Sequence, residues 1–243
     1  MRSYLSVFRD ESRLDINYVP SRLPHREKQL NLLNQFFRFA TESPGRMTQR
    51  VLIMGKIGTG KTVLAQLFGQ TVTKMAQQRG INLHYVHVNC RECKGSLFMI
   101  LQRIVLKFSP NFPRRGYSAS ELLQTLMQIL DEQKAYIILT MDELDALIRA
   151  EGTDALYSLT RVQEDRTMAT QRFSLIGIIR DVALLNTLDS STRSTLQRNI
   201  IQLGEYSKTQ LCDILKDRVI SAFYDNTVSS QTLDLIAESA ASE

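Results

Sequence analysis

The chain of 243 residues has no tryptophan, and aromatic residues make up only 7% of it. Its hydrophobic core must therefore be built mainly from aliphatic side chains. Long apolar runs are also missing, since none approaches the roughly 20 residues that a membrane-spanning helix needs. The N-terminus places Arg2, Arg9 and Asp10 among its apolar residues and has no signal-peptide core. We therefore expect a cytoplasmic protein with no membrane partner.

Cysteine is scarce as well, and Cys90, Cys93 and Cys212 are the three in the chain. Cys90 and Cys93 form a C-x-x-C pair, but a zinc site would need a second pair of ligands, and none is spaced to provide it. A redox role would fit this spacing, yet no thioredoxin-like pattern surrounds it. We expect ordinary reduced cysteines. His84 and His87 alternate along the strand predicted before Cys90, so we interpret both as strand residues rather than metal ligands.

Positive charge is in modest excess, and it is concentrated in one stretch. The formal net charge is +5. Between Arg91 and Tyr117 there are six basic residues and one acid, Glu92, so six minus one gives +5 for this stretch alone. Such a cluster attracts phosphate backbones in a salt-dependent way, although a solvated basic surface would look the same in sequence. The candidate DNA contacts are Arg91, Lys94, Arg103, Lys107, Arg114 and Arg115.

Short aliphatic runs alternate with segments of helical periodicity. The runs, together with a stretch at 83–88 that is rich in β-forming residues, predict strands at 51–54, 83–88, 135–141, 173–179 and 199–203. Helical spacing predicts helices at 61–80, 118–130 and 211–223 and from 233 onward. Continuous apolar strands separated by helices predict an α/β fold with a parallel sheet covered on both faces. Beyond residue 205 only helical spacing remains, which predicts a small helical unit there.

The clearest motif is a complete phosphate loop of the form G-x-x-x-x-G-K-T. It follows the first predicted strand and opens a helix, which is the context that confirms it. Its glycines let backbone N–H groups cradle phosphate oxygens, and the positive end of the helix faces the same anion. Lys61 is expected to reach the β- and γ-phosphates, and the Thr62 hydroxyl to ligate Mg²⁺. The nucleotide-binding residues are Gly55, Lys56, Ile57, Gly58, Thr59, Gly60, Lys61 and Thr62.

Two acids follow an apolar strand about 80 residues later. Asp142 and Glu143 end the run that starts at Tyr136, so they are expected beside the phosphate loop at the carboxyl edge of the sheet. We predict that Asp142 holds the Mg²⁺ shell and that Glu143 orients or deprotonates the attacking water. The pair therefore predicts a Mg²⁺-dependent ATPase with ATP and ADP as its ligands.

These motifs and the residues around them resemble the archaeal origin-recognition and Cdc-type replication initiators, a branch of the AAA+ ATPases. The resemblance covers Asn17–Glu27, the phosphate loop, Val88–Cys90, Met141–Leu147 and a lid entry at Tyr206, Leu211, Ile214, Leu215, Arg218 and Phe223. It implies a five-stranded sheet of order 5-1-4-3-2, with a base domain at 1–204 and an incomplete α-helical lid at 205–243.

The resemblance also implies functions for particular segments. The segment with Val19, Pro20 and Arg26 would lie over the adenine, and the stretch 91–117 would face DNA. The implied role is the initiation of DNA replication. The implied partners are double-stranded origin DNA and a replicative helicase or other initiator subunits, at the nucleoid of the cytoplasm. A winged-helix domain, which follows the lid in full members of the family, is absent from the sequence.

Three departures from the family pattern point to slow hydrolysis. Arg180 stands where the sensor 1 strand usually has Asn, and we expect a catalytic role for it near the γ-phosphate. Ser191 stands at the position of the arginine finger, with Arg193 and Arg198 as other candidates. The sequence stops at Glu243, before the stretch that supplies the sensor 2 Arg. ATP would then act as a slow switch.

Two other functions fit the same residues. A helper AAA+ ATPase of a mobile element or plasmid would share the nucleotide chemistry but act on another protein. A nucleotide-binding interaction module would keep the loop and hydrolyse almost nothing. A gene neighbourhood rich in transposase or partition genes would favour the first. An ATP turnover rate that does not change when Glu143 is replaced by Gln would favour the second.

Overall fold

The computed structural model describes residues 6–162, 170–180, 183–184, 193–194, 196 and 198–241. Within them five strands form one sheet. Each strand ends within one residue of its predicted limits. The apolar runs at 51–54, 137–141 and 173–179 are buried throughout, whereas the strands at 83–89 and 200–202 are buried only in part. The strands are β1 (Arg50–Met54), β2 (Leu83–Asn89), β3 (Tyr136–Asp142), β4 (Phe173–Ile179) and β5 (Ile200–Gln202).

The strand order is β2-β3-β4-β1-β5, which is the implied order 5-1-4-3-2 read from the other edge. All neighbouring strands are parallel, with Met54 of β1 opposite Ile179 of β4 and Asn89 of β2 opposite Asp142 of β3. The predicted α/β fold with a five-stranded parallel sheet is therefore confirmed. Because the strands run the same way, the segments that follow β1, β3 and β4 leave the sheet at one edge.

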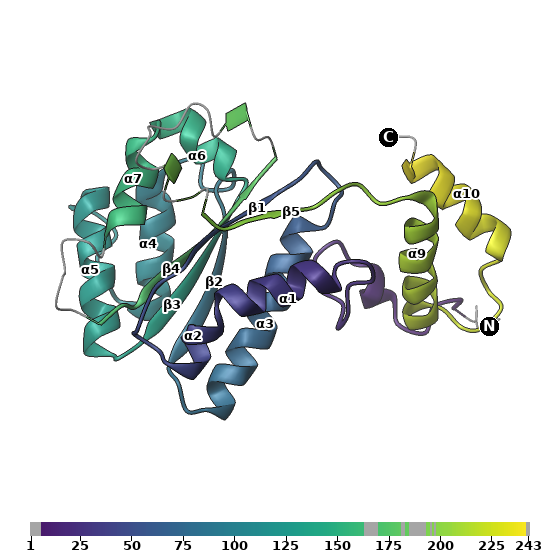
Figure 1. Cartoon of the computed structure of the whole chain (residues 1–243), viewed down its shortest axis with the longest axis horizontal. Helices are drawn as coiled ribbons and strands as arrows, with labels where there is room; N and C mark the ends of the chain where they lie inside the picture. Colours follow the sequence, from purple (N-terminus) through teal and green to yellow (C-terminus); the bar gives the residue numbers. More distant parts are fainter. Residues whose placement is uncertain are drawn as a thin grey trace, which may run out of the picture. The chain divides into compact units, whose positions relative to one another are not determined.

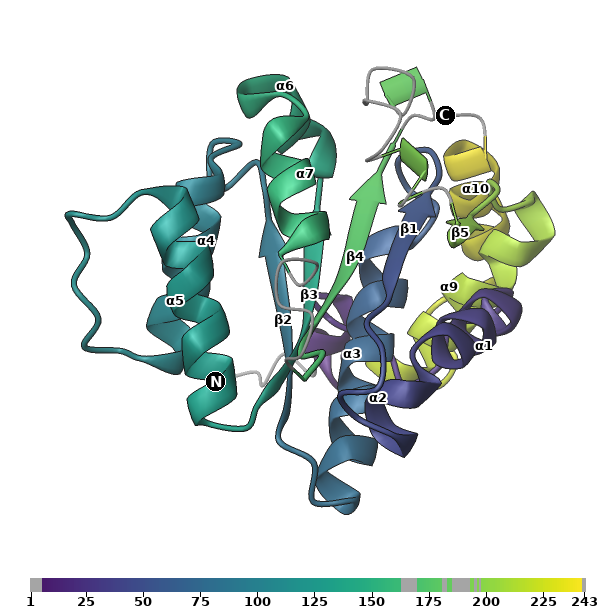
Figure 2. The same cartoon turned by 60° about the vertical axis from the view of Figure 1, so that its left-hand side comes forward.

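Helices cover both faces of this sheet (Figures 1 and 2). The chain moves from β1 to β2 in one direction across the sheet and from β2 to β4 in the other, so right-handed crossovers place the connecting helices on opposite faces. α3 (Lys61–Gln78) lies on one face together with α2 (Arg38–Glu42). The other face carries α4 (Leu97–Phe108), α5 (Ala119–Glu132), α6 (Leu144–Glu151) and α7 (Asp154–Arg161). Among the described residues, no helix is long and apolar enough to span a bilayer.

Helix α5 begins as predicted, with Ser118 and Glu121 forming a capping box. We did not predict α1 (Glu27–Phe36), α2, α4, α6 or α7. α4 lies inside the basic stretch 91–117, which we interpreted from its charged residues as a DNA contact. Its apolar residues nevertheless recur every three to four positions and are buried in the core, namely Leu97, Ile100, Leu101, Ile104 and Val105. One face of the basic stretch is therefore structural.

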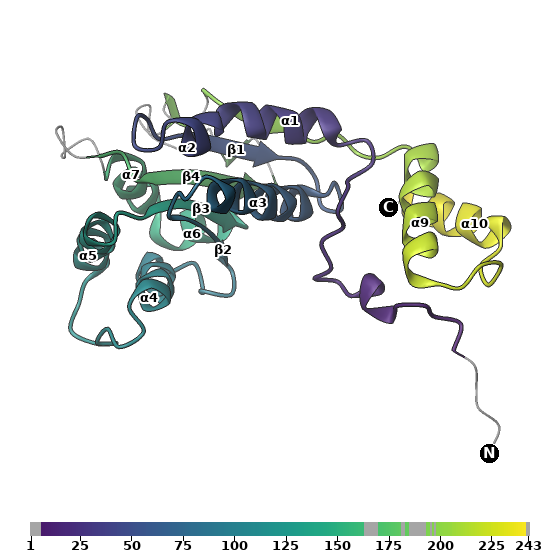
Figure 3. The same ribbon diagram turned by 90° about the horizontal axis from the view of Figure 1, so that it is seen from below.

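Contacts between residues divide the chain into two compact units. The first unit is Gln29–Leu203, which contains the sheet, and the second combines Met1–Lys28 and Gly204–Glu243. In the second unit the N-terminal segment with η1 (Glu11–Leu14) runs along α9 (Lys208–Ala222), which packs on α10 (Ser230–Ala241) (Figures 1 and 3). The Phe8 and Phe223 rings lie 4.9 Å apart. The division into 1–204 and 205–243 stays a prediction, and by contact residues 6–28 belong with the C-terminal helices.

Gly69 marks a close approach between α3 and β2. A methyl group on Gly69 would overlap the ring of Tyr85, whereas one on Gly204 would meet no atom within 4 Å. We expect Gly69→Ala to lower the free energy of unfolding by about 2 kcal/mol, because overpacking costs about 1–3 kcal/mol even where alanine favours the helix. Urea denaturation measures this, with Gly204→Ala as the control expected within about 0.5 kcal/mol of the parent. Equal midpoints for the two variants would contradict the packing described.

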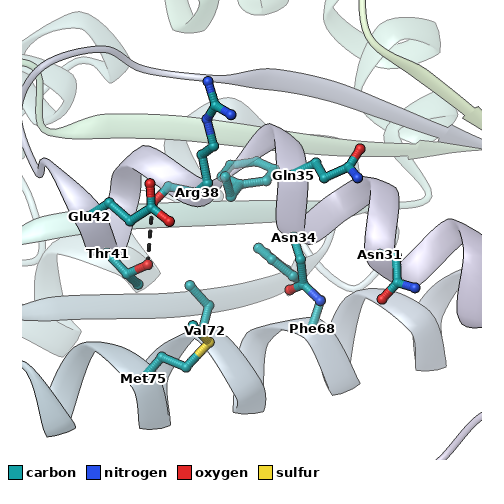
Figure 4. Close-up of a pocket in the computed structure, with 10 residues that line it drawn as sticks. Asn31, Asn34, Gln35, Arg38, Thr41, Glu42, Phe68, Val72 and Met75 are labelled. Carbon is teal, nitrogen blue, oxygen red and sulfur yellow. Dashed lines mark hydrogen bonds between the residues drawn. The ribbon is translucent and has the colours of Figure 1, made fainter.

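A hollow of about 440 Å³ lies between α1, α2 and α3 (Figure 4). Asn31 and Asn34 of α1 point toward α3, which contributes Phe68, Val72 and Met75 to the lining. No lining residue belongs to the phosphate loop or to the end of β3. The hollow is therefore separate from the nucleotide site that the sequence predicts.

Candidate nucleotide-binding site

The residues of the candidate site lie at the ends of three strands, at one edge of the sheet. β1 ends at Met54 and leads into the phosphate loop, β3 ends at Asp142, and Arg180 follows the last residue of β4. Since β4 lies between β1 and β3, the loop, the two acids and Arg180 meet at this edge. The structure thus brings together the phosphate loop and the two acids, which the sequence places at this edge, and Arg180, which the family resemblance places there.

The loop between β1 and α3 has the backbone expected of an anion cradle. Gly58 and Gly60 have φ angles of 80° and 87°, in the left-handed region that glycine adopts without strain. Gly60 is also the N-cap of α3, and a helix start offers backbone N–H groups that have no partner inside the helix. Together with the helix dipole, these donors favour a bound phosphate.

Lys61 is the buried cation of this loop. Lys61 is only 8% exposed. Its ammonium donates hydrogen bonds to the carbonyl oxygens of Gly55 at 2.7 Å and Lys56 at 2.5 Å. Burial lowers the pKa of Lys61 below its ordinary value, while the negative charge of Asp142 opposes that shift. Lys56, by contrast, is exposed. The loop therefore holds one of its two lysines inside the cradle.

Asp142 lies at the end of β3 in a network of donors. Thr62 Oγ1 donates to its Oδ2 at 2.6 Å, and the backbone N–H of Glu143 donates to its Oδ1 at 2.8 Å. His87 Nε2 of β2 lies 3.4 Å from Oδ2. Burial raises the pKa of Asp142, but the hydrogen bonds from His87 and Thr62 outweigh it, so the net pKa is lowered. Asp142 is therefore held as a carboxylate beside Thr62.

Glu143 meets the residue that follows β4. Arg180 Nη2 donates to Glu143 Oε1 at 2.5 Å, and the backbone N–H of Arg180 lies 3.4 Å from Asp145 Oδ2. Glu143 has φ 49°, a left-handed conformation that is uncommon outside glycine and that clusters at functional sites. The side chain of Glu143 is 25% exposed and that of Arg180 is 42% exposed. The acid predicted to activate water is therefore engaged by the cation predicted at sensor 1.

These residues fit a magnesium nucleotide. The left-handed glycines and the helix start supply donors for phosphate oxygens, and Lys61 supplies a positive charge. The Thr62 hydroxyl and the Asp142 carboxylate, whose oxygens lie 2.6 Å apart, are the hard oxygen ligands that Mg²⁺ takes. Among the described residues, no group of three or more His, Cys, Asp or Glu offers another metal site.

The residues predicted to cover the adenine belong to the unit that contains α9. Val19 and Pro20 are half-buried and Arg26 is buried. The Arg26 guanidinium lies 3.8 Å from the centre of the Tyr206 ring and donates to the carbonyl of Gly204 at 2.5 Å. These contacts fix Arg26 to the start of the lid, and the adenine role of this segment stays a prediction.

All six basic residues of the stretch 91–117 are exposed. Arg103 Nη1 pairs with Glu92 Oε2 at 3.1 Å, so the stretch's one acid is held by one of its cations. The carbonyl of Arg114 accepts a hydrogen bond from Gln102 at 2.7 Å, which ties the loop after α4 back to that helix. The charges thus lie outward from a buried helix face, as a DNA contact requires, and the contact itself stays a prediction.

The arginine-finger candidates fall in a sparsely described segment. Ser191 lies outside the described residues. Arg193 is half-buried and Arg198 is exposed. Their role as a finger stays a prediction.

The C-x-x-C pair is buried at the end of β2. All three cysteines are free, and Cys90 and Cys93 are 0% and 4% exposed. Burial raises the pKa of the Cys90 thiol to about 12. Cys90 is therefore a protonated core residue at neutral pH, and its backbone N–H bonds the carbonyl of Asp142 at 2.8 Å.

The model of the AAA ATPase domain family matches residues 22–176. The chain is 36% identical over 235 residues to ORC1-type DNA replication protein 2 of Sulfolobus acidocaldarius, covering 96% of this chain and 56% of that protein. The chain thus spans a little over half the length of the curated relatives it matches.

Solved structures agree with this match. The Aeropyrum pernix ORC1 protein in complex with DNA superposes with a TM-score of 0.87 at 28% identity, covering 97% of this chain and 60% of that one. Cdc6p of Pyrobaculum aerophilum gives 0.83 at 30% identity, covering 96% and 59%. With the sheet order and the phosphate loop described above, the chain belongs to the AAA ATPase domain family, and its relatives there are the ORC1-type DNA replication proteins of archaea.

Proposed function

We propose that this chain is an ATP-dependent switch in the initiation of DNA replication, with slow hydrolysis. The observation that carries the proposal is the meeting of Lys61, the Thr62–Asp142 pair and Glu143 at one sheet edge. These are the parts that phosphoryl transfer from a nucleoside triphosphate requires. The ORC1-type relatives support the role in replication.

Each residue has a part in the proposed reaction. Glu143 accepts a proton from water while the water oxygen bonds to the γ-phosphorus, and the bond from that phosphorus to the bridging oxygen of ADP breaks. Lys61 and the loop N–H groups hold the phosphates through this step. Thr62 and Asp142 would hold Mg²⁺, which would supply positive charge to neutralise the phosphates. The products are ADP and inorganic phosphate.

Two features support a low rate. Arg180 donates a hydrogen bond to the carboxylate of Glu143, so one of the two oxygens that could orient a water is already engaged. In the sequence Ser191 stands at the finger position, and an arginine finger is worth about 10³–10⁵ in rate. A nucleotide that is bound and slowly hydrolysed serves as a timed switch, because the bound and hydrolysed states can order different segments.

We further propose that the chain contacts double-stranded DNA through Arg91, Lys94, Arg103, Lys107, Arg114 and Arg115. The exposure of all six supports this, as does a structural relative described in complex with DNA. The contact would be weak and largely independent of sequence, since it rests on phosphate charge. The proposed partners are a replicative helicase or other initiator subunits, in the cytoplasm at the nucleoid.

The DNA contact is tested by the salt dependence of binding. Replacing Arg114 and Arg115 together by alanine should flatten the slope of log K against log salt by about 2, because each phosphate contact contributes about 0.9. Fluorescence anisotropy with duplex DNA at several salt concentrations measures the slope. The control is Lys28→Ala with Lys74→Ala, which removes the same charge from exposed positions elsewhere. If both variants show the same slope of log K against log salt, the stretch 91–117 is only a solvated basic surface.

A further inference from the structure

His87 of β2 lies beside the carboxylate that ends β3. The sheet register places His87 opposite Thr140, two residues before Asp142. Side chains alternate along a strand, so Thr140 and Asp142 project from one face of the sheet, and His87 projects from that face with them. The His87 side chain is 19% exposed, and its Nε2 lies 3.4 Å from Asp142 Oδ2. An imidazole is therefore a neighbour of the carboxylate proposed to hold Mg²⁺.

Tyr85 restricts the His87 ring from the other side. The Tyr85 hydroxyl lies 3.4 Å from His87 Nδ1, and the Tyr85 ring packs so closely on α3 that a methyl group on Gly69 would overlap it. A carboxylate can only accept, so the proton of the imidazole belongs on Nε2, and Nδ1 is left to accept from the Tyr85 hydroxyl. A second proton on the ring would leave Nε2 a donor, so the contact with Asp142 does not depend on the charge of His87.

Donors reach both oxygens of Asp142. Oδ1 accepts from the backbone N–H of Glu143, and Oδ2 accepts from the Thr62 hydroxyl and faces His87 Nε2. Together they fix the plane in which the carboxylate presents its remaining lone pairs. Thr62 has a second proposed task, because its oxygen is to ligate Mg²⁺. The hydrogen-bonded neighbours of a metal ligand are worth about 10- to 100-fold in metal affinity.

We propose that His87 is a positioning residue that orients the Asp142 carboxylate for Mg²⁺, with Tyr85 fixing the His87 ring. This rests on the proposed ATPase function and deepens it, because it assigns part of the cation dependence of ATP binding to a residue outside the phosphate loop. We expected His87 to be a plain strand residue and not a metal ligand. It is still no ligand here, and it acts through Asp142.

The test is ATP binding at a series of Mg²⁺ concentrations and in EDTA, measured by isothermal titration. We expect His87→Leu to raise the Mg²⁺ concentration of half-maximal effect about tenfold, the low end of the range because a 3.4 Å contact is long. ATP affinity in EDTA should stay within about twofold of the parent, because His87 acts on the cation site alone. His87→Gln should stay within about threefold of the parent midpoint, because its amide N–H can take the place of Nε2.

His84→Gln is the matched control, with the parent midpoint expected. His84 is a histidine of the same strand on the opposite face, where its ring lies 4.8 Å from that of Phe108. A parent midpoint for His87→Leu would overturn the inference and leave the ATPase function standing. Equal shifts for His87→Leu and His87→Gln would also overturn it, because lost packing would then explain both. A parent chain that binds ATP equally with and without Mg²⁺ would contradict the proposed magnesium site itself, and the inference with it.

Discussion

Lys61→Ala is expected to weaken ATP binding by about a hundredfold or more. The ammonium is buried in the loop, and its hydrogen bonds now go to the carbonyls of Gly55 and Lys56. With ATP bound, the proposed partners are phosphate oxygens of full negative charge. Hydrogen bonds to charged groups are worth about 1.5–3 kcal/mol each, and a hundredfold is about 2.7 kcal/mol.

Isothermal titration with Mg-ATP measures this loss. Lys74→Ala is the matched control, because Lys74 is an exposed lysine of α3 that lies outside the phosphate loop. We expect it to change the dissociation constant by less than about threefold, the range of an exposed charge. Thermal unfolding of both variants separates a lost phosphate contact from a collapsed loop. Equal ATP affinities for Lys61→Ala and the parent would contradict the assignment of this loop to the nucleotide site.

Glu143→Gln is expected to lower the hydrolysis rate by about 10² to 10⁴, which is the usual contribution of a positioned general base. Glutamine keeps the shape of the side chain and can still accept a hydrogen bond from Arg180, but it cannot take a proton from water. Nucleotide affinity should change little, since Lys61 and the Thr62–Asp142 pair are untouched.

Single-turnover assays with protein in excess of labelled ATP measure the chemical step without product release. Glu42→Gln removes an exposed carboxylate at the end of α2 and serves as the control, with the parent rate expected. A parent rate for Glu143→Gln as well would show that Glu143 is not the base. The chain would then fit the nucleotide-binding module that the sequence also allowed.

The sheet was predictable because β1, β3 and β4 are nearly continuous apolar runs and β2 is rich in β-forming residues. The phosphate loop was predictable from its G-x-x-x-x-G-K-T motif. The place of the Asp142–Glu143 pair was predictable because parallel strands bring the residues that follow β1 and β3 to one edge. Helix α4 was missed although its apolar period is regular. Its outward charges, Arg103 and Lys107, directed the interpretation to a surface.

Contacts between side chains were beyond the sequence. His87 was interpreted as a plain strand residue, but the register places it opposite Thr140, two residues before Asp142, which it reaches at 3.4 Å. The ion pair of Arg180 with Glu143 depends on rotamers and on the left-handed turn at Glu143. The grouping of residues 6–28 with α9 depends on contacts between positions about 200 residues apart, such as His25 with Asp213. The residue pattern within a single segment does not predict such contacts between distant segments.

Steady-state phosphate release from excess ATP, measured together with the amount of nucleotide bound per chain, decides whether this protein retains ATP or consumes it. We predict about one nucleotide bound per chain and a turnover on the order of 10⁻² s⁻¹ or slower, as in nucleotide switches that act without an external activating protein. A turnover of about 1 s⁻¹ or faster by the isolated chain, or no bound nucleotide, would contradict the slow switch.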